Sequence, residues 1–350
     1  MLTPPGMFSV VMPLWNKRPW VAATVASAIG QTWRDFELVI VDDGSTDGSL
    51  EALAQFDDPR IRILRQANAG PGAARNAGIR AARHEWVALL DADDIWLSDH
   101  LEELDEIRTR HPDAGLIGTS IVQSYRNDGF GVPARNERRI ERIDYIEQVA
   151  SGRWPVTTSS AALHKSAFEA LGGFGDALCG QDGEYWARIA LYRPVAVSTR
   201  VTSVYVLGTG GICDVVRSPC LGRDLKHWSE VHPSLALLNE RHPEEALGRH
   251  AGPIERYVDR QFRWCVRGAA RLGDIRTLRA LRGLYVRPPP LGDRLILALA
   301  RTPAPVARAA FSIGFRLKGL VRRARLARRP RGPSLSASYV QTESLHQVFE

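Results

Sequence analysis

Two clusters of aspartates contain the residues whose chemistry most needs an explanation. Asp42 and Asp43 directly follow a row of apolar, β-branched residues in the stretch FELVIVDDGSTD. Asp91, Asp93 and Asp94 follow a second apolar row in the stretch WVALLDADDIW. Adjacent carboxylates repel one another unless a cation or hydrogen-bond donors compensate their charge. Each cluster is therefore either a solvated turn or one side of a ligand site.

The elements that must position these aspartates follow from the apolar pattern of the first 122 residues. It predicts strands at residues 8–14, 36–41, 61–64, 86–90 and 114–122, and helices at 18–31, 47–56, 71–83 and 98–111. Pro71 stands where the first turn of the third of these helices begins. We expect Ser45 or Thr46 to cap the second helix. Such alternation indicates an α/β, Rossmann-like fold, in which a mostly parallel sheet carries helices on both faces.

The fold class bears directly on the two acidic clusters. Open parallel sheets bind ligands beyond the carboxyl ends of their strands, so both clusters are expected at one sheet edge. Hard cations such as Mg2+ or Mn2+ take carboxylate oxygens as ligands and often complete their shells with phosphate oxygens. The residues therefore favour a site for a divalent cation and a diphosphate over two solvated turns.

Beyond residue 122 the alternation weakens. The pattern predicts a polar, mobile loop at 126–142, strands at 157–163 and 195–207, and helices at 145–151, 166–171 and 183–191. From residue 223 onward the pattern is mostly helical. We predict a catalytic domain over residues 1–215, a helical C-terminal region over 216–330 and a disordered tail over 331–350.

Composition limits where such a protein works. The sequence is 44% hydrophobic, and no apolar run approaches the roughly 20 residues that a membrane-spanning helix needs. The N-terminal stretch MLTPPGMFSVVMP has no basic segment ahead of its apolar run, which is atypical of a secretory signal. The four cysteines fit neither a zinc ribbon nor a Cys-x-x-Cys pair, and we expect reduced thiols. These features predict a cytoplasmic protein.

The net charge of +7 is concentrated near the C-terminus. Residues 294–342 contain no Asp or Glu, and residues 291–329 mix arginines with apolar residues at helical spacing. One hypothesis is a basic amphipathic helix on the anionic inner face of the cytoplasmic membrane, as in peripheral membrane proteins. The alternative is a helix packed on the protein with a solvated basic face. No nucleic-acid partner is expected, because nothing upstream of this segment resembles a nucleic-acid-binding module.

Three stretches, in this order, resemble the successive motifs of family 2 glycosyltransferases. They are SVVMPLWNKRPWVAATVASAIGQTWRDFELVIVDDGSTDGS, NAGPGAARNAGIRAA and WVALLDADDIWLSDHL. The stretch LGGFGDALCGQDGEYWARIA is a weaker match to the acceptor-side motif of the same family. The resemblance implies the GT-A fold, an inverting hexosyltransferase-type activity, and a nucleoside-diphosphate sugar as donor.

The resemblance also implies roles for the residues at the first strand ends. Pro13, Trp15 and Asn16 would border the base of the nucleotide. Asp43 would accept a hydrogen bond from the ring N–H of the base, and Asp42 would support that loop.

Further residues of the donor site follow from the second and third motifs. Asn68 would lie beside the nucleotide, and Arg75 would lie near its phosphates or support the aspartate cluster. The DxD element, which binds nucleotide-sugar and metal in this family, would be Asp91-Ala92-Asp93. Asp93 would bind a divalent cation, Mg2+ or Mn2+, that bridges the diphosphate. Asp91 would meet the ribose or the water shell of the metal.

Asp182 is the residue that the resemblance implies as the general base. The family motif often carries Glu-Asp where this chain has Gln181-Asp182, so the aspartate is kept and its neighbour differs. Glu184 is the rival base. A carboxylate is suited to take the proton of an acceptor hydroxyl as that hydroxyl attacks the sugar.

These features predict a metal-dependent glycosyltransferase that moves a sugar to a hydroxyl of a glycan or lipid-linked acceptor in cell-surface polysaccharide biosynthesis. One alternative is a catalytically silent nucleotide-sugar-binding or scaffold protein, although both Asp93 and Asp182 are retained. A sugar nucleotidyltransferase is a second alternative. It fits less well, because PLWNKRPW has no glycine where phosphates would approach the first strand.

Overall fold

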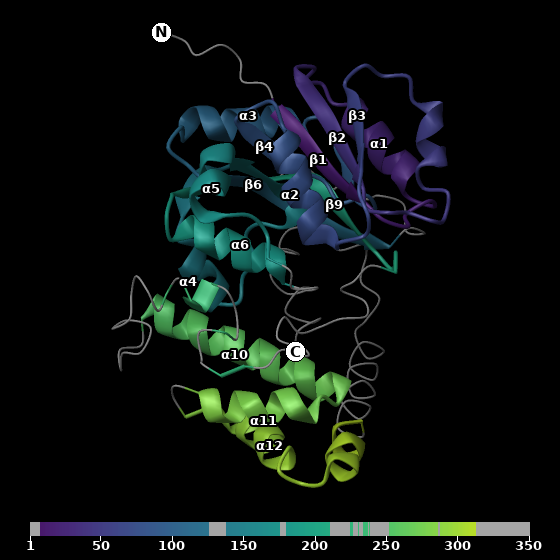
Figure 1. Ribbon diagram of the computed structural model, residues 1–350. Helices are drawn as coiled ribbons and strands as arrows, with labels where there is room; N and C mark the ends of the chain where they lie inside the picture. The colour runs from purple at the N-terminus through teal and green to yellow at the C-terminus, as the bar shows by residue number, and fades with distance from the viewer. Residues whose placement is uncertain are drawn as a thin grey trace, which may run out of the picture. The chain divides into compact units, whose positions relative to one another are not determined.

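The computed structural model describes residues 8–125, 138–175, 180–210, 225–226, 230, 234–236, 238, 252–285 and 288–312. The chain divides into a first compact unit that runs to Asp214 and a second that begins at Val215 (Figure 1). The predicted tail at 331–350, residues 126–137 of the predicted loop and residues 313–329 of the basic segment lie outside the described residues.

A nine-stranded sheet forms the centre of the first unit in the described residues. The strands are β1 Phe8–Leu14, β2 Phe36–Asp42, β3 Ile61–Arg65, β4 Trp86–Leu89, β5 Ile95–Trp96, β6 Leu116–Tyr125, β7 Ile140–Ile143, β8 Ala161–His164 and β9 Val195–Leu207. Their order is β3-β2-β1-β4-β8-β6-β9-β5, with β7 also beside β9.

Strand direction divides this sheet into two halves. β1 is parallel to β2 and β4, and β2 is parallel to β3. β8 then inserts antiparallel between β4 and β6, whereas β6 and β9 are again parallel. The predicted α/β class with a mostly parallel sheet is confirmed. The mixed half was not predicted, because it depends on strand order, which local periodicity does not encode.

Helices cover both faces of the sheet, as predicted. They are α1 Val21–Ile29, α2 Pro71–Ala81, α3 His100–Arg110, α4 Tyr145–Ala150, α5 Lys165–Leu171 and α6 Gln181–Ala190. α2 packs against β1 and β2. The approach is close at Gly78, where an added Cβ would lie 2.3 Å from Cγ1 of Val11. Glycine is therefore required there for packing.

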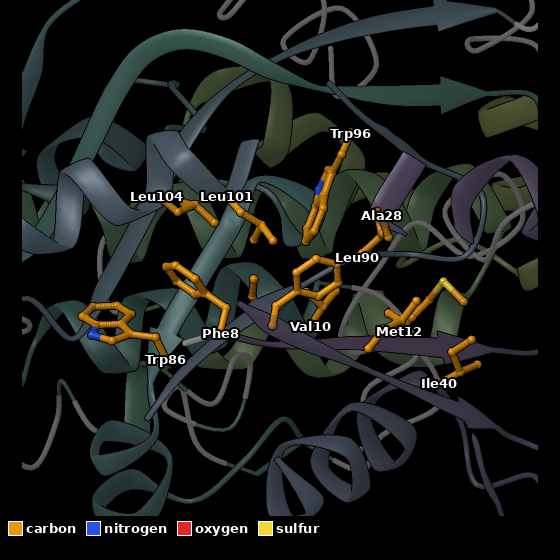
Figure 2. Packing of buried hydrophobic residues seen from close by; sticks show 14 of the residues in the cluster. Phe8, Val10, Met12, Ala28, Ile40, Trp86, Leu90, Trp96, Leu101 and Leu104 are labelled. Carbon is orange, nitrogen blue, oxygen red and sulfur yellow. The ribbon is translucent and has the colours of Figure 1, made fainter. Parts of the chain in front are cut away.

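The main core lies on the other face of β1. Phe8, Val10 and Met12 project from alternate positions of β1 into a cluster that includes Ala28 of α1 and Leu101 of α3 (Figure 2). Six of the seven residues of β1 and all of β2 are buried, as expected for parallel strands with helices on both faces. The strand ends that carry the aspartates therefore rest on a well-packed sheet.

Three local predictions differ from the structure. Residues 47–56 contain only a short 3-10 helix, η1 Glu51–Gln55, whose N-cap is Leu50 rather than Ser45 or Thr46. The predicted strand at 157–163 begins instead with a 3-10 turn, η3 Thr158–Ser160, before β8. β5 and β7 were not predicted; both pair with β9, so their hydrogen bonds come from a distant segment.

The described part of the second unit contains helices α10 Pro253–Leu272, α11 Ile275–Leu284 and α12 Leu291–Leu299. α10 ends at Gly273, which has a positive φ of 68°, and Asp274 then caps α11 by accepting a hydrogen bond from the Thr277 N–H at 3.0 Å. The predicted helical C-terminal region is confirmed in these residues. None of the described helices is both long enough and apolar enough to cross a bilayer.

Candidate active site

Asp43 is buried at the end of β2, and it organises the loop that follows β3. Its Oδ1 accepts hydrogen bonds from Gln66 Nε2 at 2.7 Å and from the Ala69 N–H at 2.9 Å, and its Oδ2 accepts one from the Gly70 N–H at 2.9 Å. These donors compensate the buried charge. Since a carboxylate offers about four acceptor positions, Asp43 retains one for a ligand donor.

Asp42 and Asn68 lie in the same region, but one is buried and the other is exposed. Asp42 is buried and accepts a hydrogen bond from the Ser45 N–H at 3.1 Å, so it holds the turn after β2. Asn68 is exposed in the loop that Asp43 holds. The backbone N of Asn68 would lie 3.2 Å from a Cβ added at Gly44, so the two loops are in close contact there.

The end of β1 is joined to the turn after β2 through Asn16. This residue has a positive φ of 50°, which asparagine tolerates better than most residues. Its N–H donates to Ser45 Oγ at 3.2 Å, and its Oδ1 accepts from the Thr46 N–H at 2.8 Å. Trp15, the preceding residue, leaves 48% of its surface exposed. Pro13, two residues before Trp15, is half-buried within β1.

Asp91 follows β4 and pairs with Arg75 of α2. Arg75 Nη2 donates to Asp91 Oδ1 at 2.6 Å, and the guanidinium lies 5.4 Å from the centre of the Phe174 ring. Burial raises the pKa of Asp91 above its usual value, Arg75 opposes this increase, and the charges of Asp93 and Asp182 add to it. Asp182 is therefore close enough to Asp91 for the two carboxylates to interact.

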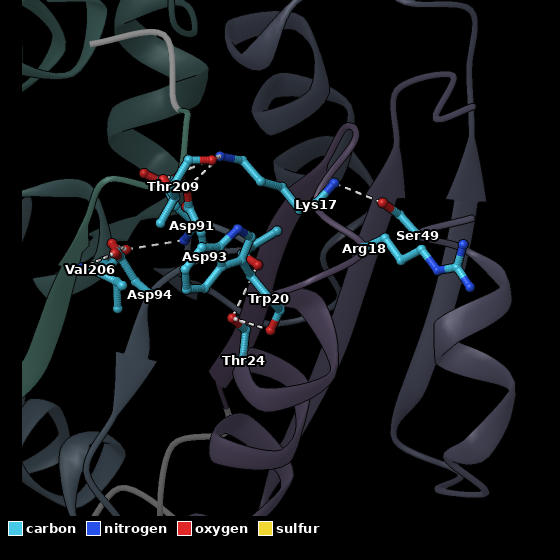
Figure 3. Close-up of polar contacts among 12 residues, drawn as sticks. Lys17, Arg18, Trp20, Thr24, Ser49, Asp91, Asp93, Asp94, Val206 and Thr209 are labelled. Atoms are coloured by element: carbon cyan, nitrogen blue, oxygen red, sulfur yellow. Dashed lines mark hydrogen bonds and ion pairs between the residues drawn. The ribbon is translucent and has the colours of Figure 1, made fainter. Parts of the chain in front are cut away.

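Asp93 pairs with a lysine from the loop after β1. Lys17 Nζ lies 2.5 Å from Asp93 Oδ2, and Thr209 Oγ1 donates to the same oxygen at 2.6 Å (Figure 3). Lys17 is anchored at its backbone, where its N–H donates to Ser49 Oγ at 2.7 Å. Between the two aspartates, Ala92 is buried, and its carbonyl accepts a hydrogen bond from Thr24 Oγ1 at 3.1 Å.

Asp94 lies beside the DxD residues and accepts hydrogen bonds from two other elements. Its Oδ2 accepts a hydrogen bond from Ser159 Oγ at 2.5 Å, and its Oδ1 accepts one from the Val206 N–H at 3.0 Å. Burial raises the pKa of Asp94 well above its usual value, and the charges of Asp93 and Asp91 raise it further. Asp94 therefore joins η3 and β9 to the end of β4.

Asp182 lies in the first turn of α6. Thr158 Oγ1 of η3 donates to Asp182 Oδ2 at 3.4 Å, so the same 3-10 turn contacts both Asp182 and Asp94. Glu184 is buried and forms a two-point contact with Arg188, in which Nη2 lies 3.0 Å from Oε2. The Glu184 carboxylate is therefore held by Arg188, whereas the Asp182 carboxylate contacts η3.

The structure thus brings Asp42, Asp43, Asn16 and Asn68 together at one group of loops, and Asp91, Asp93, Arg75 and Asp182 at a second. Lys17 connects the two groups, because it bonds Ser49 through its backbone and Asp93 through its side chain. Sequence reasoning missed Lys17, Thr209 and Ser159. The stretch NKR after the first strand offered a basic residue near the site, but nothing local marked Thr209 or Ser159.

Comparison with known proteins relates part of this sheet and its loops to a family. Residues 9–172 match the model described as glycosyl transferase family 2. Residues 9–172 therefore form a family 2 glycosyltransferase domain. The matched range holds β1 to β4 with both acidic clusters, and it ends before Asp182 of α6.

Relatives of the family 2 domain include a protein named for succinoglycan biosynthesis and an uncharacterized glycosyltransferase. The succinoglycan biosynthesis protein ExoW of Rhizobium meliloti is 40% identical over 120 residues, which are 33% of this chain and 37% of that protein. The uncharacterized glycosyltransferase EpsJ of Bacillus subtilis is 36% identical over 147 residues, 41% of this chain and 42% of that protein. This chain thus covers less than two thirds of either relative.

The similarity to solved structures extends beyond the family 2 domain. The crystal structure of S. aureus TarS 1-349 in complex with UDP-GlcNAc superposes with a TM-score of 0.54 at 17% identity, over 89% of this chain and 92% of that chain. The complex of the same protein with UDP gives a TM-score of 0.52. At this identity the likeness concerns the fold, which is of the GT-A type.

Proposed function

We propose that this protein is an inverting, metal-dependent glycosyltransferase that takes its sugar from a nucleoside diphosphate. The observation that carries the proposal is the convergence of Asp182 of α6 with the DxD carboxylates of the family 2 domain at one 3-10 turn. Thr158 Oγ1 of η3 donates to Asp182, and the next residue, Ser159, accepts a hydrogen bond from the Asp91 N–H at 3.1 Å. A DxD pair alone would serve many nucleotide-binding proteins. A further carboxylate near that pair supplies the base that sugar transfer to a hydroxyl requires.

The proposed reaction is a single displacement. Asp182 takes the proton of the acceptor hydroxyl, whose oxygen forms a bond to the anomeric carbon. The bond between that carbon and the phosphate oxygen breaks, and the nucleoside diphosphate leaves with the electron pair. One base is enough for inversion, and no second carboxylate needs to act as a nucleophile. Arg75 holds Asp91 in position, because its guanidinium is fixed by the ion pair and by contact with Phe174.

The residues fit a divalent cation that arrives with the diphosphate. In the described residues, no group of three Asp, Glu, His or Cys side chains could hold a metal by itself. Asp93 nevertheless attracts a cation, since the Lys17 ammonium lies against its Oδ2. With Asp93 and Asp91 as the protein ligands, diphosphate oxygens and water would complete the shell, as is common for Mg2+. When bound, the cation neutralises charge on the leaving group.

The nucleotide itself is proposed to bind across the ends of β1 and β2. Asp43 has one acceptor position left for a ring N–H of the base, and its other contacts hold it rigidly. The exposed ring of Trp15 offers an aromatic face close to this carboxylate's loop. Polysaccharide synthesis is proposed as the setting because one relative, ExoW, is named for succinoglycan biosynthesis.

The deciding experiment is calorimetric titration of the purified protein with UDP, GDP and dTDP, each with and without Mn2+. We expect one nucleotide to bind in a metal-dependent manner, and the matching nucleotide sugars can then be tested for transfer. Metal-dependent binding without release of nucleoside diphosphate to any acceptor would favour a silent binding protein. Consumption of a nucleoside triphosphate and a sugar 1-phosphate would favour the nucleotidyltransferase alternative.

We further propose that α12 contacts an anionic membrane surface, which would place the enzyme at the inner face of the cytoplasmic membrane. Leu291 and Leu295, one turn apart, are 73% and 60% exposed, and Leu299 continues the same face. Arg294 and Arg301 lie beside this row, and residues 294–342 carry no acidic residue. An exposed apolar face with basic flanks is complementary to anionic lipid.

Vesicle sedimentation tests this surface. We expect the protein to sediment with phosphatidylglycerol-containing vesicles at low salt, less so at high salt, and less with phosphatidylcholine alone. Leu295→Ser should weaken binding, whereas Val306→Ser, an exposed apolar change outside α12, should have a smaller effect. Absence of sedimentation would refute the proposal. If Leu295→Ser loses both sedimentation and a concentration-dependent dimer, the exposed face of α12 binds a second copy of the chain instead.

A further inference from the structure

The two DxD carboxylates each have a cation supplied by the protein, but the two cations differ in kind. Asp91 pairs with Arg75, whose side chain is 8% exposed and packs against Phe174. Asp93 pairs with Lys17, whose ammonium sits at the end of a flexible four-carbon stem. Apart from Asp93, the Lys17 ammonium contacts only Thr209, at 3.5 Å, in the described residues. Arg75 is therefore fixed, whereas Lys17 is able to turn away.

A divalent cation and the Lys17 ammonium would compete for the same carboxylate. Lys17 and Thr209 both donate to Asp93 Oδ2, so that oxygen is already occupied. Two positive groups within hydrogen-bond distance of one oxygen repel each other strongly in a partly buried site. A cation that takes Oδ2 must displace Lys17. The displaced ammonium then needs another anion, and its backbone is anchored at Ser49 beside the turn after β2.

We propose that Lys17 is an exchangeable counter-cation of the DxD element. Without donor it neutralises Asp93, and when a cation–diphosphate binds it transfers to the diphosphate oxygens. The inference rests on the proposed function for the identity of the donor. It adds a residue that both restrains binding of the bare metal and strengthens binding of the diphosphate. Lys17 would thus favour loading of cation and diphosphate together over loading of the cation alone.

Two affinities of the Lys17→Met variant test the exchange, with Mn2+ alone and inorganic pyrophosphate as probes. Met keeps the length of the side chain and removes its charge. Mn2+ binding, followed by its electron paramagnetic resonance signal without any nucleotide, should tighten by about tenfold, since one charged hydrogen bond no longer competes. Pyrophosphate binding at saturating Mn2+ should weaken by about tenfold, because the diphosphate loses one charged hydrogen bond from Lys17. A gain in metal affinity would not result from a merely damaged fold.

Two matched variants serve as controls. Arg18→Met removes one positive charge at the next position, where the backbone N–H bonds Asp47, and should leave both affinities within about twofold of the wild type. Lys17→Arg keeps the charge and should keep Mn2+ binding weak. Thermal unfolding should show that all three variants fold, and if Lys17→Met does not, Lys17→Gln replaces it.

The outcomes separate this inference from the proposed function. Unchanged or weaker Mn2+ binding in Lys17→Met overturns the competition, and unchanged pyrophosphate binding overturns the transfer to the diphosphate. If the nucleotide binds without metal and no variant binds Mn2+, the exchange is refuted. A glycosyltransferase that needs no metal is still compatible with that result. Tighter Mn2+ and weaker pyrophosphate binding in a protein that binds no nucleotide would uphold the exchange and refute the proposed donor.

Discussion

Arg75 Nη2 donates a hydrogen bond to Asp91 Oδ1 at 2.6 Å, and this contact ties α2 to the end of β4. The guanidinium is buried, so its charge depends on this carboxylate for compensation. The two DxD residues therefore differ in their partners, because a rigid side chain holds Asp91 and a flexible one holds Asp93. The predictions below start from this pair.

Arg75→Met should destabilise the protein by about 3 kcal/mol, because Asp91 would be left as a partly buried charge without its partner. Asp91→Asn in the Arg75→Met background should cost much less than the sum of the two single changes. Urea unfolding of the wild type, both single variants and the double variant measures the coupling. Strictly additive free energies of unfolding would show that the contact contributes nothing.

Asp182→Asn should lower kcat by a factor on the order of 10² to 10⁴, since the acceptor hydroxyl would lose its base. Affinity for the nucleoside diphosphate should stay unchanged, because the hydrogen bond of the Asp182 side chain in the described residues comes from Thr158 of η3 and not from the loops after β1 and β2. The measurement is release of nucleoside diphosphate from the donor that the titration identifies.

The matched control for the base is Glu184→Gln. Glu184 pairs with Arg188, so its loss should lower the free energy of unfolding by about 3 kcal/mol and leave kcat of the folded enzyme near that of the wild type. A large loss of kcat in Glu184→Gln with normal activity in Asp182→Asn would reverse the assignment of the base.

Gly78→Ala should destabilise the protein by about 1–3 kcal/mol, because the added Cβ would lie 2.3 Å from Cγ1 of Val11. Gly283→Ala in α11 is the matched change, since nothing lies within 4 Å of its added Cβ. That variant should be stabilised by about 0.5–1 kcal/mol through helix propensity. Equal effects of the two substitutions, measured by thermal unfolding, would contradict the close packing of α2 on β1.

His100 should make stability depend on pH. It is buried in α3, its Nδ1 lies 2.7 Å from Thr202 Oγ1, and burial lowers its pKa to about 3. The unfolded chain binds a proton on this side chain near pH 6.5, whereas the folded chain does not until about pH 3. Its contribution is therefore fully present above pH 6.5 and is lost progressively as the pH falls towards 3.

Urea unfolding at pH 7, 6 and 5 tests the histidine in a range where most carboxylates stay ionised. The wild type should lose about 1.4 kcal/mol for each pH unit below about 6 through this group. His100→Gln, which keeps a hydrogen-bonding side chain, should lack that part of the slope. The same slope in both proteins would mean that His100 is protonated in the folded state.

Several features of the fold were predictable because they depend on short stretches of chain. The apolar runs that became β1, β2 and β4 are continuous, so they read as strands buried on both faces. The helix that starts at Pro71 followed from the preference of proline for the first helical position. The polar residues of the site were predictable for the same reason, because Asp42 and Asp91 directly follow such strands.

Other predictions were wrong because contacts of individual residues decide the local structure. Asp47 accepts hydrogen bonds from the Ser49 N–H and the Arg18 N–H, so the turn after β2 is held to the loop after β1 and a regular helix does not start there. Residues 140–142 were predicted as part of a polar loop, yet they belong to β7, because β9 supplies their backbone partners. A segment of low strand propensity takes the structure that its neighbour in space allows.

By itself the sequence determined the alternation of strands and helices, the acidic strand ends and the family resemblance, because each is written in local periodicity or in consecutive motifs. Only the tertiary structure decided which partner each carboxylate has. Asp93 meets Lys17 from 76 positions away, and Asp94 meets Val206 from 112 positions away. Such contacts depend on strand order and on the antiparallel insertion of β8. Both result from packing of the whole sheet, which no local pattern contains.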